Sequence, residues 1–96
     1  MKNIEEIKSV LGSHKHDLFE RYPIASLAIF GSYARNDQSE TSDLDVMVEF
    51  NDRIGIRFID LAEELENILK MKIDLVSKKG IKEKYLKSID TDLIYV

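Results

Sequence analysis

A short apolar run that ends at a glycine and a serine is the feature that most constrains the fold of this chain. Residues 24 to 30, Ile-Ala-Ser-Leu-Ala-Ile-Phe, are almost uninterrupted in their apolar character, as is typical of a strand buried on both faces. Gly31 breaks the run, and Ser32 is a residue type that often caps a helix. The sequence therefore predicts a buried strand that leads through Gly31 into a short helix, capped by Ser32 and ending at Arg35.

Apolar spacing predicts the remaining elements. The first helix ends before Pro23. Its apolar face is expected to consist of Ile4, Ile7, Leu11, His14 and Leu18. Helices are predicted over residues 3–21, 58–69 and 81–89, a half-buried strand over 44–49 and further strands over 72–76 and 93–96. The last segment is either an edge strand or the final strand of the core. The predicted fold class is α/β (α+β), with a mixed sheet of three to four strands flanked by helices.

Length and composition argue against several classes of protein. A chain of 96 residues has room for one small domain, residues 1–96. A net charge of -4 argues against general nucleic-acid binding, which needs a basic surface. The absence of cysteine excludes disulfides and thiolate zinc sites. Because no signal peptide or apolar run of about 20 residues is visible, we expect a cytoplasmic protein without a membrane-spanning segment.

Asp43 and Asp45 are two residues apart at the predicted strand that follows the short helix. Residues at this spacing point to the same side of a strand, so the two carboxylates lie together. Adjacent carboxylates repel each other unless a cation lies between them. Mg²⁺ is commonly held by one or two carboxylates together with substrate phosphates. The pair therefore predicts a magnesium site.

Gly31 and Ser32 supply a complementary feature. The backbone at a glycine can approach a ligand closely, and the N–H groups that open a helix favour a phosphate. Gly31 ends its strand whereas Asp43 begins the next, so these ends meet only if the two strands are antiparallel. Asp74 begins a third strand after a helical crossover, which places it beside Asp45 on a parallel neighbour. A phosphate-binding turn facing three carboxylates indicates nucleotidyl transfer.

The stretch GSYARNDQSETSDLDVMV, residues 31–48, resembles the signature of the polymerase-β-like nucleotidyltransferases. In its small size the chain is similar to the minimal nucleotidyltransferase (MNT) group, the antitoxin partners of HEPN-domain toxins. Asn36 departs from the glycine that family members often have there. The resemblance implies transfer of AMP from ATP to a tyrosine of the toxin. It also implies that Asp43, Asp45 and Asp74 are the catalytic residues and bind two Mg²⁺ ions, and that Gly31, Ser32 and Arg35 bind the nucleotide.

Other interpretations of the same residues remain open. The chain could be a non-catalytic antitoxin that acts by binding alone. It could also be a small-molecule (aminoglycoside-type) nucleotidyltransferase. In that case the acceptor pocket would form between two copies of the chain in a homo-oligomer. Arg35 could form only a surface salt bridge, and Tyr33 could stack on a base or pack in the core. His14 and His16 do not share a helix face and are interpreted as structural. Four lysines that flank the third predicted strand either attract the phosphates of a nucleotide or form a solvated rim: Lys70, Lys72, Lys78 and Lys79.

Overall fold

Four strands form one mixed sheet in the computed structural model, which describes residues 3–96. Across the sheet the order is β3-β2-β1-β4. β1 is antiparallel to both β2 and β4, whereas β2 and β3 are parallel. The mixed sheet and both predicted strand directions are therefore confirmed. The strands are β1 (Ile24–Phe30), β2 (Leu44–Phe50), β3 (Ile73–Ser77) and β4 (Ile94–Tyr95).

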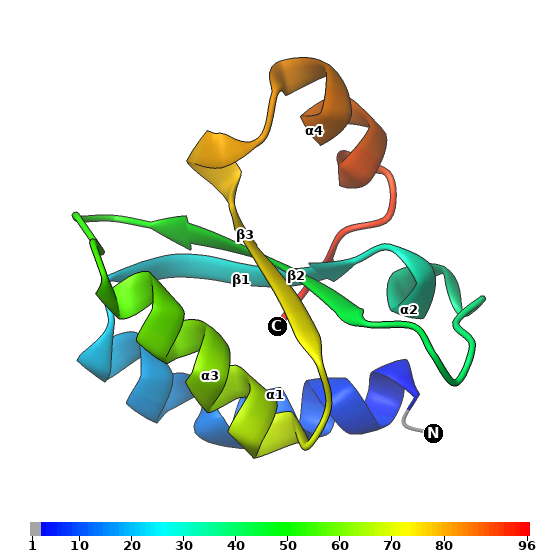
Figure 1. Cartoon of the computed structure of the whole chain (residues 1–96), viewed down its shortest axis with the longest axis horizontal. Coiled ribbons are helices and arrows are strands. Elements are labelled where there is room, and N and C mark those ends of the chain that lie inside the picture. Colours follow the sequence, from blue (N-terminus) through cyan, green and yellow to red (C-terminus); the bar gives the residue numbers. More distant parts are fainter. Residues whose placement is uncertain (1–2) are drawn as a thin grey trace.

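The helices lie on both sides of this sheet. Two long helices, α1 and α3, cover one face, and α4 lies on the opposite side, above the sheet in Figure 1. The short α2 projects from the end of β1. Their bounds are α1 (Ile4–Arg21), α2 (Ser32–Arg35), α3 (Arg57–Leu69), the 3-10 turn η1 (Lys78–Gly80) and α4 (Glu83–Asp90).

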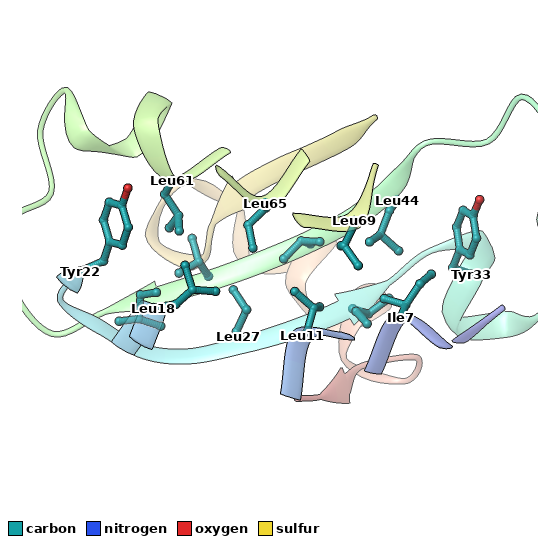
Figure 2. Packing of buried hydrophobic residues seen from close by; sticks show 14 residues of the cluster. Ile7, Leu11, Leu18, Tyr22, Leu27, Tyr33, Leu44, Leu61, Leu65 and Leu69 are labelled. Atoms are coloured by element: carbon teal, nitrogen blue, oxygen red, sulfur yellow. The ribbon is translucent and has the colours of Figure 1, made fainter. Parts of the chain in front are cut away.

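The hydrophobic core lies between the sheet and the layer formed by α1 and α3. Figure 2 shows the leucines of both helices directed toward the strands, with Tyr22 and Tyr33 at opposite ends of the cluster. Alternation along β2 explains the arrangement, since Leu44, Val46 and Val48 enter this core while their neighbours face the other side. Burial of this layer fixes the register of β2. That register in turn places Asp45 on the side opposite to α1 and α3.

The first helix follows its prediction closely except at one residue. The side chain of Asn3 caps α1 by accepting a hydrogen bond from the Glu6 backbone N–H at 2.9 Å. Ile7, Leu11 and Leu18 are buried. His14, which was expected on this apolar face, is exposed instead, and its Nδ1 lies 2.9 Å from the carbonyl oxygen of Val10. The imidazole of His14 thus contacts its own helix backbone instead of entering the core.

The second half of the chain departs more from the predictions. β3 lies one residue later than expected, and η1 precedes an α4 that begins at Glu83 rather than at Ile81. Met47 is buried, although β2 was expected to be only half-buried. β4 is an edge strand rather than a central one. None of the helices within residues 3–96 is long and apolar enough to cross a membrane.

Candidate active site

Asp45 and Asp74 lie side by side on neighbouring parallel strands. They are direct partners in the β2–β3 register, as the order of the elements predicted. The side chain of Asp45 is half-buried, whereas Asp74 and Asp43 are exposed. The sheet thus brings two of the three predicted carboxylates to adjacent positions, and Asp43 immediately precedes β2 at the same edge.

The electrostatics of Asp45 connect it to each of the other two carboxylates. Burial, followed by the negative charges of Asp74 and then Asp43, raises the pKa of Asp45 above its ordinary value. The guanidinium of Arg35 acts in the opposite direction. An acid that is disfavoured in its charged form both by burial and by like charges is a common signature of a functional site.

Gly31 makes the closest approach to Asp45. Its φ of 75° is in a region that side chains disfavour. A β-carbon built at Gly31 would overlap Oδ2 of Asp45 and would lie 3.0 Å from its Cγ. Only glycine satisfies both requirements without displacement. The phosphate-binding turn predicted from the sequence is therefore packed directly against a predicted metal ligand.

The turn that follows Gly31 forms α2. Gly31 rather than Ser32 is the N-cap, and no side chain caps the helix, so the predicted capping role of Ser32 is wrong. Ser32 is instead the first helical residue, and its carbonyl oxygen accepts hydrogen bonds from the backbone of Asn36 and of Asp37. Asn36 adopts the left-handed conformation with a φ of 61°. Asparagine tolerates this conformation better than most residues, which explains how it replaces glycine at this position.

Arg35 is held by two carboxylates outside the predicted site. Its Nε lies 3.2 Å from Oδ2 of Asp37, and its Nη1 lies 3.6 Å from Oδ2 of Asp92. Hydrogen bonding to Asp37 is the main cause that raises the pKa of Arg35 above its ordinary value. The salt-bridge interpretation of Arg35 is thus confirmed, and a role in nucleotide binding stays a prediction. Asp92 was missed from the sequence because its place beside α2 depends on the pairing of β4.

The loop before Asp43 is ordered by its own hydroxyl groups. The Ser39 backbone N–H donates to Oγ of Ser42 at 2.9 Å, and the Ser42 backbone N–H donates to the Ser39 carbonyl at 3.1 Å. The Ser39 hydroxyl also lies 3.1 Å from that of Thr41. Such local bonds are typical of serine and threonine turns. They fix the chain as it enters β2 and so position Asp43.

A cleft of about 670 Å³ opens beside this loop. Asp43, Lys70 and Lys72 are among its lining residues. Two of the four lysines that were considered as phosphate-attracting therefore lie near Asp43, a candidate metal ligand. Tyr33 also lines it, but only 3% of its surface is exposed, so its packing role is confirmed. Lys78 lies elsewhere, 3.8 Å from Glu49. The other residues lining the cleft are Glu6, Glu40, Thr41, Ser42 and Met71.

The donor set fits a hard divalent cation, since it consists of carboxylate oxygens whose negative charges disfavour one another. Asp43, Asp45 and Asp74 are the residues that would hold it. Within residues 3–96, however, no three acidic or histidine side chains are close enough to form a ready-assembled metal site.

Comparison with known proteins identifies the family and the fold. Residues 11–94 match the family described as nucleotidyltransferase domain. A Methanocaldococcus jannaschii protein described as a candidate protein adenylyltransferase is 51% identical over 98 aligned positions, which cover 100% of both chains. A Thermococcus cleftensis protein named protein adenylyltransferase MntA is 38% identical, over 100% of this chain and 98% of its own length.

Two solved structures share the fold. One, described as a candidate minimal nucleotidyltransferase, has a TM-score of 0.84 and 26% identity, and the match covers 99% of this chain and 97% of that one. Another is the MNT antitoxin in complex with a tri-AMPylated HEPN toxin of Shewanella oneidensis. Its TM-score is 0.68 and its identity 21%, with coverage of 93% of this chain and 70% of that one. The chain belongs to the nucleotidyltransferase domain family, is an enzyme of that class, and carries the fold of the minimal nucleotidyltransferases.

Proposed function

We propose that this enzyme transfers AMP from ATP to a tyrosine hydroxyl of a HEPN-family toxin, with Mg²⁺ as cofactor, and thereby acts as its antitoxin. The observation that carries the proposal is the contact between Gly31 and Asp45, with Asp74 beside Asp45 on the next strand. A phosphate-binding turn and a carboxylate pair meet at one edge of the sheet. The names of the relatives, which describe AMP transfer to protein, support the same activity.

The residues of the site have separate tasks in this reaction. The Ser32 hydroxyl and the first N–H groups of α2 bind the β- and γ-phosphates, because the first N–H groups of a helix have no intrahelical acceptor. Asp43, Asp45 and Asp74 would hold Mg²⁺, which would neutralise the charge of the triphosphate and of the departing pyrophosphate. Asp74, which is exposed, accepts the proton of the acceptor hydroxyl at its carboxylate. The tyrosine oxygen then bonds to the α-phosphorus, and the bond from that phosphorus to the bridging oxygen of pyrophosphate breaks.

The binding surface that the chain offers supports a protein as the acceptor. The cleft beside Asp43 is open and is lined by charged and polar side chains from several elements. Small-molecule sites are usually more enclosed and more apolar. A protein that presents a tyrosine would supply the missing walls of the site. The complex of a related fold with an AMPylated HEPN toxin shows such a pairing in another protein.

A transfer assay with a HEPN-family toxin tests the proposal. The expected result is label from α-labelled ATP on the partner in the presence of Mg²⁺, with fragmentation mass spectrometry locating AMP on a tyrosine. Asp45→Asn should abolish the label because it removes a metal-binding charge. Asp52→Asn is the matched control, since Asp52 is exposed in the turn after β2. The absence of label on this partner and on every other cellular protein would refute the proposal.

A cell-protection assay separates catalysis from simple binding. Cells that express the toxin should survive with the wild-type chain and should die with Asp43→Asn if transfer is what neutralises the toxin. Equal protection by both proteins would favour the non-catalytic antitoxin. Label on an aminoglycoside but on no protein would favour the small-molecule enzyme.

A further inference from the structure

Asp92 lies next to the phosphate-binding turn although it is far from that turn in the sequence. β4 pairs antiparallel with β1 through Ile94 with Ile29 and Tyr95 with Ala28. Asp92 lies in the turn between α4 and β4, two residues before Ile94. There its carboxylate reaches Arg35 of α2, whose backbone N–H donates to the carbonyl oxygen of Gly31 at 3.1 Å. The pairing of β4 with β1 therefore brings Asp92 to the turn that begins at Gly31.

Arg35 is held by two carboxylates outside the candidate site. Its Nη1 lies 3.6 Å from Oδ2 of Asp92, and its Nε lies 3.2 Å from Oδ2 of Asp37. The positive charge of Arg35 also lowers the pKa of Asp45, although less than burial, Asp74 and Asp43 raise it. Asp37 and Asp92 together thus fix a cation on the helix that follows Gly31.

We propose that Asp92 is a positioning residue, which holds Arg35 beside the phosphate-binding turn, where its guanidinium is available to a nucleotide phosphate. Arginine has a long and flexible side chain, a permanent charge and a geometry suited to phosphate. Without Asp92, Asp37 is the one remaining ion-pair partner of Arg35 within residues 3–96. The orientation of the guanidinium is then less fixed, and its contribution to nucleotide binding falls. Asp92 therefore acts through Arg35 and touches no reacting atom itself.

This inference rests on the proposed function, but its first test needs no acceptor. Binding of α,β-methylene-ATP, whose α–β linkage cannot be cleaved, is measured calorimetrically with and without Mg²⁺. Because the Arg35–Asp92 pair is partly exposed, at 48% and 32% of the side chains, its loss should weaken binding in Mg²⁺ about fivefold in Asp92→Asn. Asp92→Glu should restore the affinity. Asp90→Asn, an exposed residue at the end of α4, is the matched control and should leave it unchanged.

Two further measurements distinguish positioning from a purely structural role. In an Arg35→Ala background, Asp92→Asn should add no further loss of binding, because the residue through which it acts is gone. In the transfer assay, Asp92→Asn should raise KM for ATP and leave kcat unchanged. Arg35→Ala removes the same ion pair from its other end. It should weaken binding at least as much, which separates the proposed effect from a failure of Asp92→Asn to fold.

The results that would overturn the proposal are equally specific. Wild-type affinity in Asp92→Asn, an undiminished loss in the Arg35→Ala background, or the same loss in Asp90→Asn would each refute it. A fall in kcat at constant KM would do so as well. If the wild-type protein binds the nucleotide but labels no acceptor, the proposed function fails while the binding comparison still decides the role of Asp92. If it binds no nucleotide, both fail.

Discussion

The side chain of Asp45 occupies the space that a β-carbon would need at Gly31. An added methyl group would overlap Oδ2 of Asp45 and would lie 3.3 Å from its Cβ. The positive φ of Gly31, 75°, imposes a second and independent requirement for glycine. The turn and the carboxylate are therefore mutually fitted, and a change at one residue has consequences at the other.

Gly31→Ala should reduce both stability and activity. The backbone of Gly31, with a φ of 75° and a ψ of -151°, lies in a region that costs an L-residue roughly 1–3 kcal/mol, and displacement of Asp45 adds to that cost. We expect the free energy of unfolding in urea to fall by at least about 1 kcal/mol, and AMP transfer to be lost. Gly12→Ala is the matched control, because Gly12 lies inside α1 with nothing within 4 Å of an added Cβ.

The control should change in the opposite direction. Alanine within a helix is favoured over glycine by roughly 0.5–1 kcal/mol, so Gly12→Ala should raise the free energy of unfolding and keep full activity. If Gly31→Ala were as stable and as active as the wild-type protein, the close fit between Gly31 and Asp45 would be wrong.

Asp45→Asn should abolish transfer without loss of stability. Burial and the charges of Asp74 and Asp43 raise the pKa of Asp45, so ionisation of this acid disfavours the folded state. This penalty is complete above the raised pKa and absent below the ordinary value of 3.8. The neutral amide removes it at pH 7. Urea unfolding at pH 7 should give a free energy equal to or above that of the wild-type protein, whereas a clear loss would contradict this account.

Much of the fold and of the candidate site could be predicted from local patterns. The bounds of β1 follow from its apolar run and Gly31, and the alternation of Leu44, Val46 and Val48 identifies β2. The positions of Gly31 and Asp43 at opposite ends of their strands predict the antiparallel pairing that is observed. The helical crossover before Asp74 predicts its place beside Asp45. These inferences succeed because sheet geometry leaves few alternatives.

Features that depend on long-range pairing could not be predicted in this way. The ion pair between Arg35 and Asp92 exists because β4 adds to the edge of β1, and a two-residue strand carries almost no sequence signal. The burial of Met47 also departs from the alternation along β2, which predicts a half-buried strand. Exposure of His14 also escaped the pattern, because helical spacing alone does not define the width of a buried face.

Leu65→Ala should destabilise the protein strongly. Leu65 is fully buried between Leu61 and Leu69 on the face of α3 that meets the sheet. Replacement of a buried leucine by alanine typically costs about 2–5 kcal/mol, a large part of the roughly 5–15 kcal/mol that stabilises a domain. Ile59→Ala on the same helix is the control, since 56% of Ile59 is exposed. Thermal unfolding should separate the two variants clearly, and equal midpoints would contradict the described core.

Glu64 should make stability depend on acidic pH. The hydrogen bond from Arg21, more than that from the Tyr22 hydroxyl at 2.7 Å, holds the pKa of Glu64 below its ordinary value of 4.5. The ionised carboxylate therefore stabilises the folded state above pH 4.5, and this contribution is lost as the pH falls through the lowered pKa. Glu64→Gln should lower the free energy of unfolding at pH 7 by about 1 kcal/mol or less, because the ion pair is partly exposed.

The difference between Glu64→Gln and the wild-type protein should disappear in strong acid, where both side chains are neutral. Urea unfolding at neutral pH and below the lowered pKa provides the comparison. Glu63→Gln changes the same charge on the adjacent, exposed position of α3 and should give equal differences at both pH values. A Glu64→Gln difference that persisted in acid would show that packing, rather than the charge held by Arg21 and Tyr22, accounts for the contribution of Glu64. Because Asp45 and Glu64 have pKa shifts of opposite sign, their variants should respond to acid in opposite directions.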